Sequence, residues 1–228
     1  MTYTLITANR NYSSWSLRPW VLMKALGIAF EDKLEPFTLP VNYEAFRSFS
    51  PTGQVPVLID GARTVWDSLG IVLHLSERHE GVWPGEAAAR AFAQSATCEM
   101  HAGFPTLRRD CTMNVGVRVR PRPLSGPLVR EVFRLRELFE EGLDRFGGPW
   151  LAGPAFTAID AFYAPVAFRI RTYGLEVGKG QAWVDAMLAH PAMQQWEEEA
   201  LAETWREESH EAELAQAGEI LADHRRGA

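Results

Sequence analysis

The chain has 228 residues, a formal net charge of −6 and a charged fraction of 23%, values near those of ordinary soluble globular proteins. This length suffices for one large domain or for two of ordinary size, with a full hydrophobic core. The acidic balance gives no electrostatic reason to bind nucleic acid or an anionic membrane. We therefore expect a soluble protein of two compact units that has neither kind of partner.

The first residues and the cysteines set further expectations. The N-terminus lacks a basic segment followed by an apolar one, so we expect no secretory signal and a cytoplasmic location. The two cysteines, Cys98 and Cys111, have no second Cys/His pair at the spacing of a metal site. We expect neither a disulfide framework nor a bound metal. A cluster of arginines is expected to form a solvated turn: Arg118, Arg120, Arg122 and Arg130.

Strand and helix signals alternate in the first part of the chain. Pro36 and Pro40 interrupt regular structure there. In chain order the signals predict a strand over 3–7, a helix over 15–26 ended by Gly27, a strand over 28–34, a short helix over 43–49, a strand over 55–60, a hairpin turn at Asp60-Gly61, a return strand over 64–66 and a helix whose N-cap is Ser68. This order predicts a small α/β unit.

Helical periodicity dominates the rest of the chain. Gly81, Pro84 and Gly85 interrupt it first, so we predict one domain over 1–80, a linker over 81–86 and an all-helical domain over 87–228. The expected elements are one long helix over 87–112, a second over 128–146 beyond three prolines, and an acidic tail from Glu197 that forms a solvated, frayed helical face.

A capping box is predicted at the start of a later helix, in the segment Thr157-Ala158-Ile159-Asp160. The threonine hydroxyl can accept from the backbone N–H of Asp160, while the Asp160 carboxylate reaches back to the cap. We therefore predict a structural role for Asp160. Pro165 lies inside the same helix and is expected to kink it, because proline lacks a backbone donor.

Small hydroxyl side chains stand where the first strand leads into the first helix, in Ser13-Ser14-Trp15-Ser16. A helix N-terminus exposes unpaired N–H groups and a partial positive charge, so a hydroxyl there can polarise an anion or a thiolate. Disulfide reductases of the thioredoxin kind carry Cys-x-x-Cys at such a junction, whereas this segment contains no sulfur. Any thiol chemistry must therefore use a thiol that arrives as substrate.

Two further short segments can join that junction. If Pro56 of Gln54-Val55-Pro56 is cis, the backbone before it faces outward and can pair with a peptide-like ligand. In Asp67-Ser68, at a helix start, the carboxylate can bind an amine while the hydroxyl and nearby N–H groups bind a carboxylate. Together with the serine junction, these segments suggest a ligand with an α-amino acid end, a peptide unit and a thiol, a description that glutathione meets.

These segments, in this order and followed by the capping box, resemble those of the cytosolic glutathione transferases across nearly the whole chain. The serine types, zeta and theta in particular, look closest. Ser13 and Ser14 match the paired serines of the zeta pattern, but Trp15 replaces its cysteine and Asp67 replaces the usual glutamate. The resemblance implies a thioredoxin-like N-terminal domain, an all-α C-terminal domain, a homodimer and a detoxifying role.

The resemblance also implies a mechanism. Lowering a thiol pKa of about 8.5 by about two units requires roughly 2.7 kcal/mol. A charge-assisted hydrogen bond contributes about 1.5–3 kcal/mol and an exposed helix end about 0.3–1. Ser14 has the register of the catalytic serine in theta-like enzymes, four residues before Arg18, while Ser13 matches the first zeta serine, so both stay candidates. Arg18 is expected to anchor the first helix or the domain contact.

The resemblance implies that glutathione contacts Trp15, Gln54, Val55, Pro56, Asp67 and Ser68. It places the site of a small hydrophobic electrophile between the domains, on the first helix of the second domain. The residues expected there are Met100, His101, Phe104 and Arg108. We predict a metal-free transferase that conjugates glutathione to this electrophile. Two alternatives stay open, a glutathione-dependent isomerase and a noncatalytic module that binds glutathione or a protein.

Overall fold

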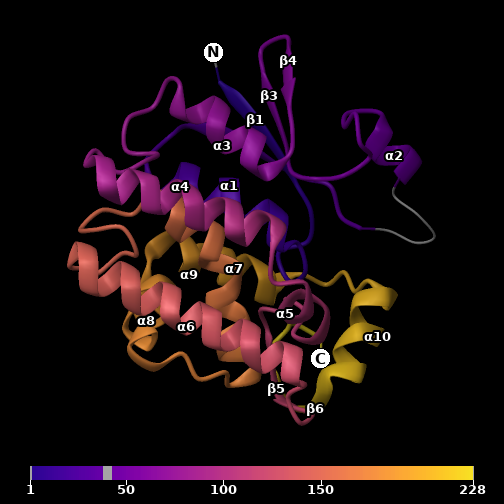
Figure 1. Ribbon diagram of the computed structural model, residues 1–228. Coiled ribbons are helices and arrows are strands. Elements are labelled where there is room, and N and C mark those ends of the chain that lie inside the picture. The colour runs from indigo at the N-terminus through magenta and orange to yellow at the C-terminus, as the bar shows by residue number, and fades with distance from the viewer. Residues whose placement is uncertain (1, 38–42, 228) are drawn as a thin grey trace.

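The computed structural model describes residues 2–37 and 43–227 of the chain. The predicted break at Pro40 lies outside these residues. A mixed sheet with α1 and α3 lies at one end of the molecule, and the helices from α4 onward pack beneath it (Figure 1). None of the described helices is long and apolar enough to cross a membrane.

The sheet has four strands in the order β2-β1-β3-β4. Their bounds are β1 Tyr3–Thr7, β2 Phe30–Leu34, β3 Val57–Asp60 and β4 Arg63–Val65. β1 pairs parallel with β2 and antiparallel with β3, so that the buried side chains of Leu5 and Leu58 lie in register. Gly61 adopts a φ of 60°, the left-handed conformation that the tight turn between β3 and β4 requires. The strands expected from the sequence are all present.

Three helices accompany the sheet: α1 Ser14–Ala25, α2 Tyr43–Arg47 and α3 Ser68–Ser76. Gly27, at a φ of 66°, ends the first helical segment as predicted. One cap differs from expectation. Asp67, not Ser68, is the N-cap of α3, since its carboxylate accepts from the backbone N–H groups of Leu69 and Gly70. Aspartate and serine are comparably good caps, so composition alone does not choose between adjacent candidates.

Helices make up most of the remaining chain. They are α4 Ala87–Ala102, α5 Pro105–Asp110, α6 Gly126–Phe146, α7 Ala158–Tyr173, a 3₁₀ turn Gly178–Gly180, α8 Gln181–Ala189, α9 Pro191–Ala202 and α10 Glu208–Ala217. The single long helix predicted over 87–112 is wrong. It breaks where Phe104 takes a φ of 58° ahead of Pro105, because proline starts a new helix rather than continuing the old one.

A two-stranded antiparallel sheet, not anticipated from the sequence, joins β5 (Val117–Pro121) to β6 (Gly218–Asp223) near the C-terminus (Figure 1). Arg118 and Arg120 therefore lie on a strand and Arg130 on α6, so the expected turn is wrong, although Arg120, Arg122 and Arg130 are exposed to solvent as expected. The tail is likewise not a frayed helical face. Buried Arg225 binds Glu211 and Asp223 and so ties the chain end to α10.

The buried helix α7 is the centre of the packing, in contact with both α1 and α4. Its predicted capping box is present, and the buried Asp160 carboxylate also accepts from the Leu151 backbone N–H and from the indole of Trp183. This confirms the structural reading of Asp160. The Ala158 backbone N–H donates to the Val82 carbonyl at 2.9 Å, which fixes the segment between α3 and α4 against α7.

Candidate functional site

The serine junction folds as a tight loop against the start of α1. Ser13 is the N-cap residue and Ser14 the first helical residue, and the two are 5% and 6% exposed. The Ser13 hydroxyl donates to Ser16 Oγ at 2.7 Å, and that oxygen in turn accepts from the Ala8 backbone N–H at 3.2 Å. Ser13 therefore holds the loop together. The Ser14 hydroxyl makes no such contact among the described residues and stays available to a ligand.

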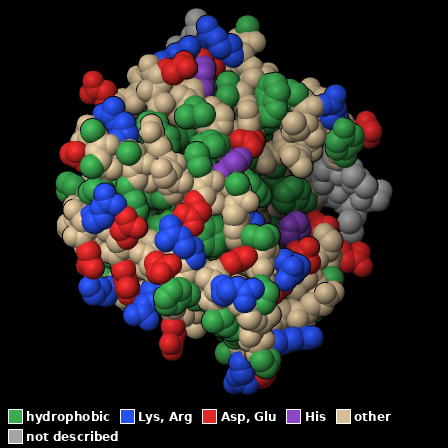
Figure 2. All heavy atoms as spheres, viewed as in Figure 1, with side chains coloured by type: hydrophobic (Ala, Val, Ile, Leu, Met, Phe, Trp, Pro, Cys, Tyr) green, Lys and Arg blue, Asp and Glu red, His purple; other side chains and the backbone are tan. Residues whose placement is uncertain are grey.

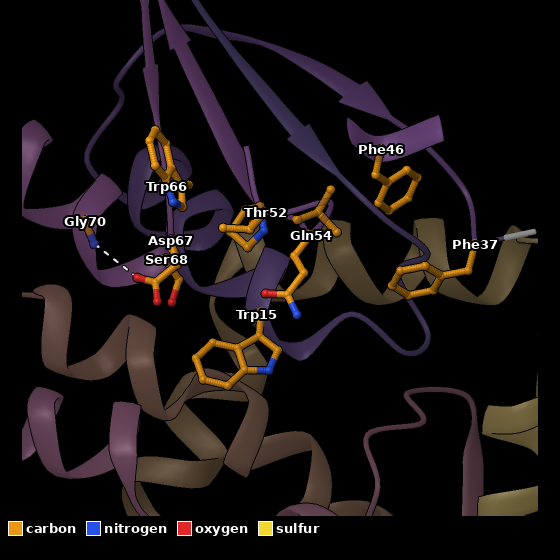
Figure 3. A pocket seen from close by; sticks show the side chains of 11 residues that line it. Trp15, Phe37, Phe46, Thr52, Gln54, Trp66, Asp67, Ser68 and Gly70 are labelled. Carbon is orange, nitrogen blue, oxygen red and sulfur yellow. Dashed lines mark hydrogen bonds between the residues drawn. The ribbon is translucent and has the colours of Figure 1, made fainter. Parts of the chain in front are cut away.

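A first cavity, of about 730 Å³, opens between α1 and the β3–α3 region. Every residue predicted to contact glutathione lines it. Figure 3 shows Trp15 on one side of it, with the Gln54 amide directed toward the indole and Asp67 and Ser68 on a neighbouring wall. Phe37 and Phe46 form its apolar end. The sequence reasoning did not assign the other lining residues: Phe37, Phe46, Thr52, Trp66 and Gly70.

The Gln54-Val55-Pro56 segment presents its backbone at the cavity. The Val55-Pro56 peptide bond is cis, as the ligand-binding hypothesis for this segment required. The Ser50 hydroxyl donates to the Gln54 carbonyl at 2.6 Å and accepts from the Gln54 N–H at 3.1 Å, so it fixes the loop from behind. Backbone groups of Val55 are thereby left at the cavity, where an extended peptide ligand can pair with them.

Asp67 and Ser68 offer two different kinds of contact. One oxygen of the Asp67 carboxylate caps α3, while the other lies 3.3 Å from His101 Nε2, and the side chain is largely exposed to the cavity. The Ser68 hydroxyl is fully buried, lines the cavity, and has no hydrogen-bond partner among the described residues. A buried hydroxyl without a partner is costly, so a ligand oxygen at this point would satisfy it.

A second cavity, of about 210 Å³, adjoins the first and contains both candidate serines. Trp15 and Phe37 line both cavities and form the partition between them. The remaining walls come from α5, the segment that follows it, α7 and α10: Arg108, Thr112, Met113, Arg169, His210 and Glu213. A thiol held at the partition would therefore face the serine hydroxyls on one side and this cavity on the other.

Two arginines and a histidine surround the Trp15 indole. The guanidinium carbons of Arg18 and Arg108 lie 4.0 and 4.8 Å from its ring centre, and the His101 ring packs edge-on at 5.4 Å. Arg18 is fully buried between this indole and the ring of Phe162, which fits its predicted role at the contact between α1 and the helical part. Burial lowers the pKa of His101, opposed by the Asp67 carboxylate, so its imidazole is neutral at neutral pH.

Comparison with known proteins identifies the family of this chain. Residues 12–78 match the family model "Glutathione S-transferase, N-terminal domain" and residues 118–199 match "Glutathione S-transferase, C-terminal domain". The chain belongs to the glutathione S-transferase family. The matched parts contain the serine junction, the Gln54–Pro56 loop, Asp67 and Ser68 on one side and α7 on the other.

Two curated relatives are similar over a short segment. A dichloromethane dehalogenase of Methylophilus leisingeri is 42% identical over 55 residues, which are 23% of this chain and 21% of the relative. A dichloromethane dehalogenase of Methylorubrum extorquens is 34% identical over 61 residues, 26% of this chain and 21% of the relative. The matches thus span about a fifth of the length of these relatives.

Solved structures share the whole architecture at low identity. The theta class glutathione S-transferase of Xanthomonas axonopodis, with glutathione bound, is 23% identical, with a TM-score of 0.65 over 85% of this chain and 96% of that one. A glutathione transferase homologue from Burkholderia, also with bound glutathione, is 19% identical, with a TM-score of 0.64 over 88% and 98%. These likenesses establish the glutathione transferase fold, an N-terminal mixed sheet followed by a helical domain.

The predicted electrophile residues separate in the structure. Arg108 lines the second cavity, and His101 contacts Trp15 and Asp67. Met100 is fully buried in the core, and Phe104 packs on Tyr163 and lines a different, shallow cavity beside α6. The structure does not bring Met100 or Phe104 to the site. Met100 lies on α4 as predicted, but its side chain is buried in the core, and the chain leaves the predicted helical path at Gly103, ahead of Phe104.

In the second cavity, sequence reasoning missed Arg169 and His210 among other lining residues. Arg169 is buried within α7, and a buried arginine is an unusual placement that signals function or pairing. His210 carries no such signal. It reaches the cavity only because α10 folds back toward the serine junction, where the imidazole stacks on Tyr12 and Phe37.

Proposed function

We propose that this family member is an enzyme that binds glutathione in the first cavity and transfers its sulfur to a small electrophile in the second. The observation that carries the proposal is the partition: Trp15 separates a peptide-sized cavity from a smaller one that holds the helix-start serines. The N-terminal unit, residues 1–80, would hold glutathione and the helical unit, residues 87–228, would supply the electrophile side. Residues 81–86 would link them.

The contacts of the first cavity suit each part of glutathione. Its α-amino group would meet the Asp67 carboxylate, and its α-carboxylate the unpaired Ser68 hydroxyl and the N-terminus of α3. Its cysteinyl backbone would pair with Val55 at the cis bond to Pro56, beneath the Gln54 side chain. This placement directs the thiol toward Trp15 and the start of α1.

Among the two candidate serines, the geometry favours Ser14 as the donor to the thiolate. A serine hydroxyl has one proton, and Ser13 gives its proton to Ser16. Ser14 keeps its proton and stands at the first position of α1, where backbone N–H groups and the helix dipole add to the stabilisation of negative charge. The protein would thus be a serine-type transferase, with a mechanism close to that expected of theta- or zeta-like members.

The test is a pH titration of the thiol of bound glutathione, followed by thiolate ultraviolet absorbance in the wild type, Ser14→Ala and Ser13→Ala. We expect the bound thiol of the wild type to titrate about two units below its solution pKa of about 8.5. Ser14→Ala should reverse most of that shift and slow conjugation of an aryl chloride about 10- to 100-fold. Ser13→Ala should alter the thiol pKa much less.

Three outcomes would correct the proposal in different ways. A larger effect of Ser13→Ala would transfer the role of donor to Ser13. Tight glutathione binding with a solution-like thiol pKa and no turnover would identify a noncatalytic binding module. Turnover without consumption of glutathione would identify an isomerase. Because its relatives include dichloromethane dehalogenases, dichloromethane belongs in the electrophile panel beside the aryl chloride. A cytoplasmic, homodimeric, detoxifying enzyme is the corresponding cellular proposal.

A further inference from the structure

Two guanidinium groups in the second cavity each leave a donor unpaired. Arg169 is only 4% exposed; its Nε donates to the Cys111 carbonyl at 2.8 Å, but its Nη1 has no partner among the described residues. Arg108, half-buried, donates through Nε to the Gly103 carbonyl at 3.0 Å, and its Nη1 is likewise unpaired within the described chain. Buried charged donors without partners are costly, so the cavity is prepared for an acceptor.

Arg18 adds a third positive charge close to the cavity. It is fully buried, and none of its three guanidinium nitrogens has a hydrogen-bond partner among residues 2–37 and 43–227. Burial, and then the positive charges of Arg108 and Arg169, lower the pKa of Arg18 well below its ordinary value. The three guanidinium groups therefore repel one another, and an anion placed between them and the serines would relieve that repulsion.

The carboxylates near the second cavity have other partners. Glu131, whose charge opposes the lowering of the Arg108 pKa, accepts from the backbone N–H groups of Thr106 and Leu107. Glu207 is occupied by the His210 imidazole at 2.5 Å, and Glu211 by Arg225 and the Tyr12 hydroxyl. Asp67 faces the first cavity and His101. Glu213 lines the rim of the second cavity, where it is exposed to water and screened. No carboxylate of residues 2–37 and 43–227 accepts from the unpaired Nη1 groups of Arg108 and Arg169, so we expect a ligand to supply the acceptor.

We infer that the second cavity binds the carboxylate of an anionic electrophile, so that the second substrate is a small organic acid and not a purely hydrophobic molecule. The inference rests on the proposed function, because it names the substrate class of the same site. Arg108 and Arg169 would hold the carboxylate, while Ser14 in the same cavity holds the thiolate beside the electrophilic carbon. A volume of about 210 Å³ suits an acid with a single small ring.

A suitable probe is 4-chloro-3-nitrobenzoate, with 4-chloro-3-nitrobenzamide as its neutral match in shape. In the conjugation step the thiolate sulfur attacks the ring carbon that bears chlorine. The C–S bond forms, the C–Cl bond breaks, and chloride leaves with the bonding electron pair. No oxidant, reductant or further proton is needed once the thiolate is present. The carboxylate takes no part in the bond changes, so it can stay on the arginines throughout.

The experiment measures the binding of both probes by calorimetry, in a buffer free of carboxylates, with unreactive S-methylglutathione filling the first cavity. We expect the wild type to bind the acid about tenfold or more tightly than the amide, because the amide lacks the charged acceptor for the arginine donors. Arg108→Gln should remove most of this preference while leaving amide affinity nearly unchanged. Arg109→Gln is the matched control, because Arg109 is exposed and pairs with Asp110 outside this cavity.

Arg169→Gln provides a second variant should Arg108→Gln fail to fold, as judged by circular dichroism. Equal affinities of the wild type for acid and amide would overturn the inference, as would a preference that survives in both arginine variants. Turnover of the amide that depends on Ser14, with no preference for the acid, would keep the proposed function and reject the anionic substrate. Selective acid binding without turnover of either probe would keep the anion site and reject the transfer reaction.

Discussion

The two cavities on either side of Trp15 are built in different ways. The first is lined by residues from a compact stretch of the N-terminal chain, and apart from Trp15 they lie between positions 37 and 70. The second takes side chains from the serine junction, α5, α7 and α10, which span most of the sequence. The first is therefore a property of one local fold, whereas the second exists only when the helical part and the C-terminal segment are packed in place.

The contrast extends to the chemistry. The first cavity offers an exposed carboxylate, a serine hydroxyl and backbone groups, which suit a zwitterionic peptide. The second offers two guanidinium groups with unpaired donors beside the serines. Acidic and basic side chains are otherwise interspersed over the face seen in Figure 2, so the charge of the second cavity is a local feature and not part of a broad basic surface. Trp15 thus lies between two cavities whose ligand preferences can change independently.

Asp67→Asn is expected to give the largest difference between its effects on the ligands of the two cavities. Asparagine keeps the cap of α3, which needs only one acceptor oxygen, but removes the charge offered to the amine of glutathione. Glutathione should bind about tenfold more weakly, the loss expected for a charge-assisted hydrogen bond. Binding of 4-chloro-3-nitrobenzoate should be unaffected. Calorimetry with each ligand alone measures both, and Asp144→Asn, at an exposed carboxylate paired with Lys179, controls for the change in net charge.

Glu211→Gln should produce the opposite pattern with a smaller effect. Glu211 joins the Tyr12 hydroxyl at 2.6 Å to Arg225 and so holds α10 against the serine junction. Glutamine weakens this connection but leaves Arg225 its partner Asp223. We expect the acid probe to bind about threefold more weakly, within the range of one weakened hydrogen bond, and glutathione to bind as before. Equal weakening of both ligands would show that the two cavities are not independent.

His101 gives the smallest expected effect, a shift in its own pKa. Its ring contacts Trp15, and it lies beside Asp67. Burial lowers its pKa below the ordinary value of 6.5, and the Asp67 carboxylate opposes that shift. The contribution of His101 to the free energy of unfolding is therefore complete above its pKa in the unfolded chain. It is lost as pH falls through its pKa in the folded protein. Nuclear magnetic resonance of the imidazole should give a midpoint below 6.5, lower still in Asp67→Asn. A midpoint above 6.5 would contradict the described environment of this residue.

Local patterns predicted the first cavity well because each of its parts is a short contiguous motif. The turn at Asp60-Gly61, the loop before Pro56 and the start of α3 depend on neighbouring residues, and all were found where expected, with the cap displaced from Ser68 to Asp67. The capping box at Asp160 was predicted for the same reason. Family resemblance then gave these motifs a shared ligand, which their individual patterns do not specify.

The second cavity was not predictable in this way. Arg108, Met100 and Phe104 were all expected near the electrophile through the resemblance, on one helix that was predicted to continue through Pro105. The pairing of β5 with β6 links segments about a hundred residues apart, and no local periodicity reports such a pairing. Without it, the return of α10 and His210 toward the serines cannot be foreseen.

The sequence by itself determined the elements of the N-terminal unit, the glutathione-type motifs and the absence of a sulfur nucleophile at the serine junction, because residue identity and near neighbours govern each of these. Only the tertiary structure decided which serine keeps a free hydroxyl and which arginines keep unpaired donors. Those facts depend on the bend of the serine junction that brings the Ser13 hydroxyl to Ser16, and on contacts such as that of Arg169 with Cys111, 58 residues apart in the chain.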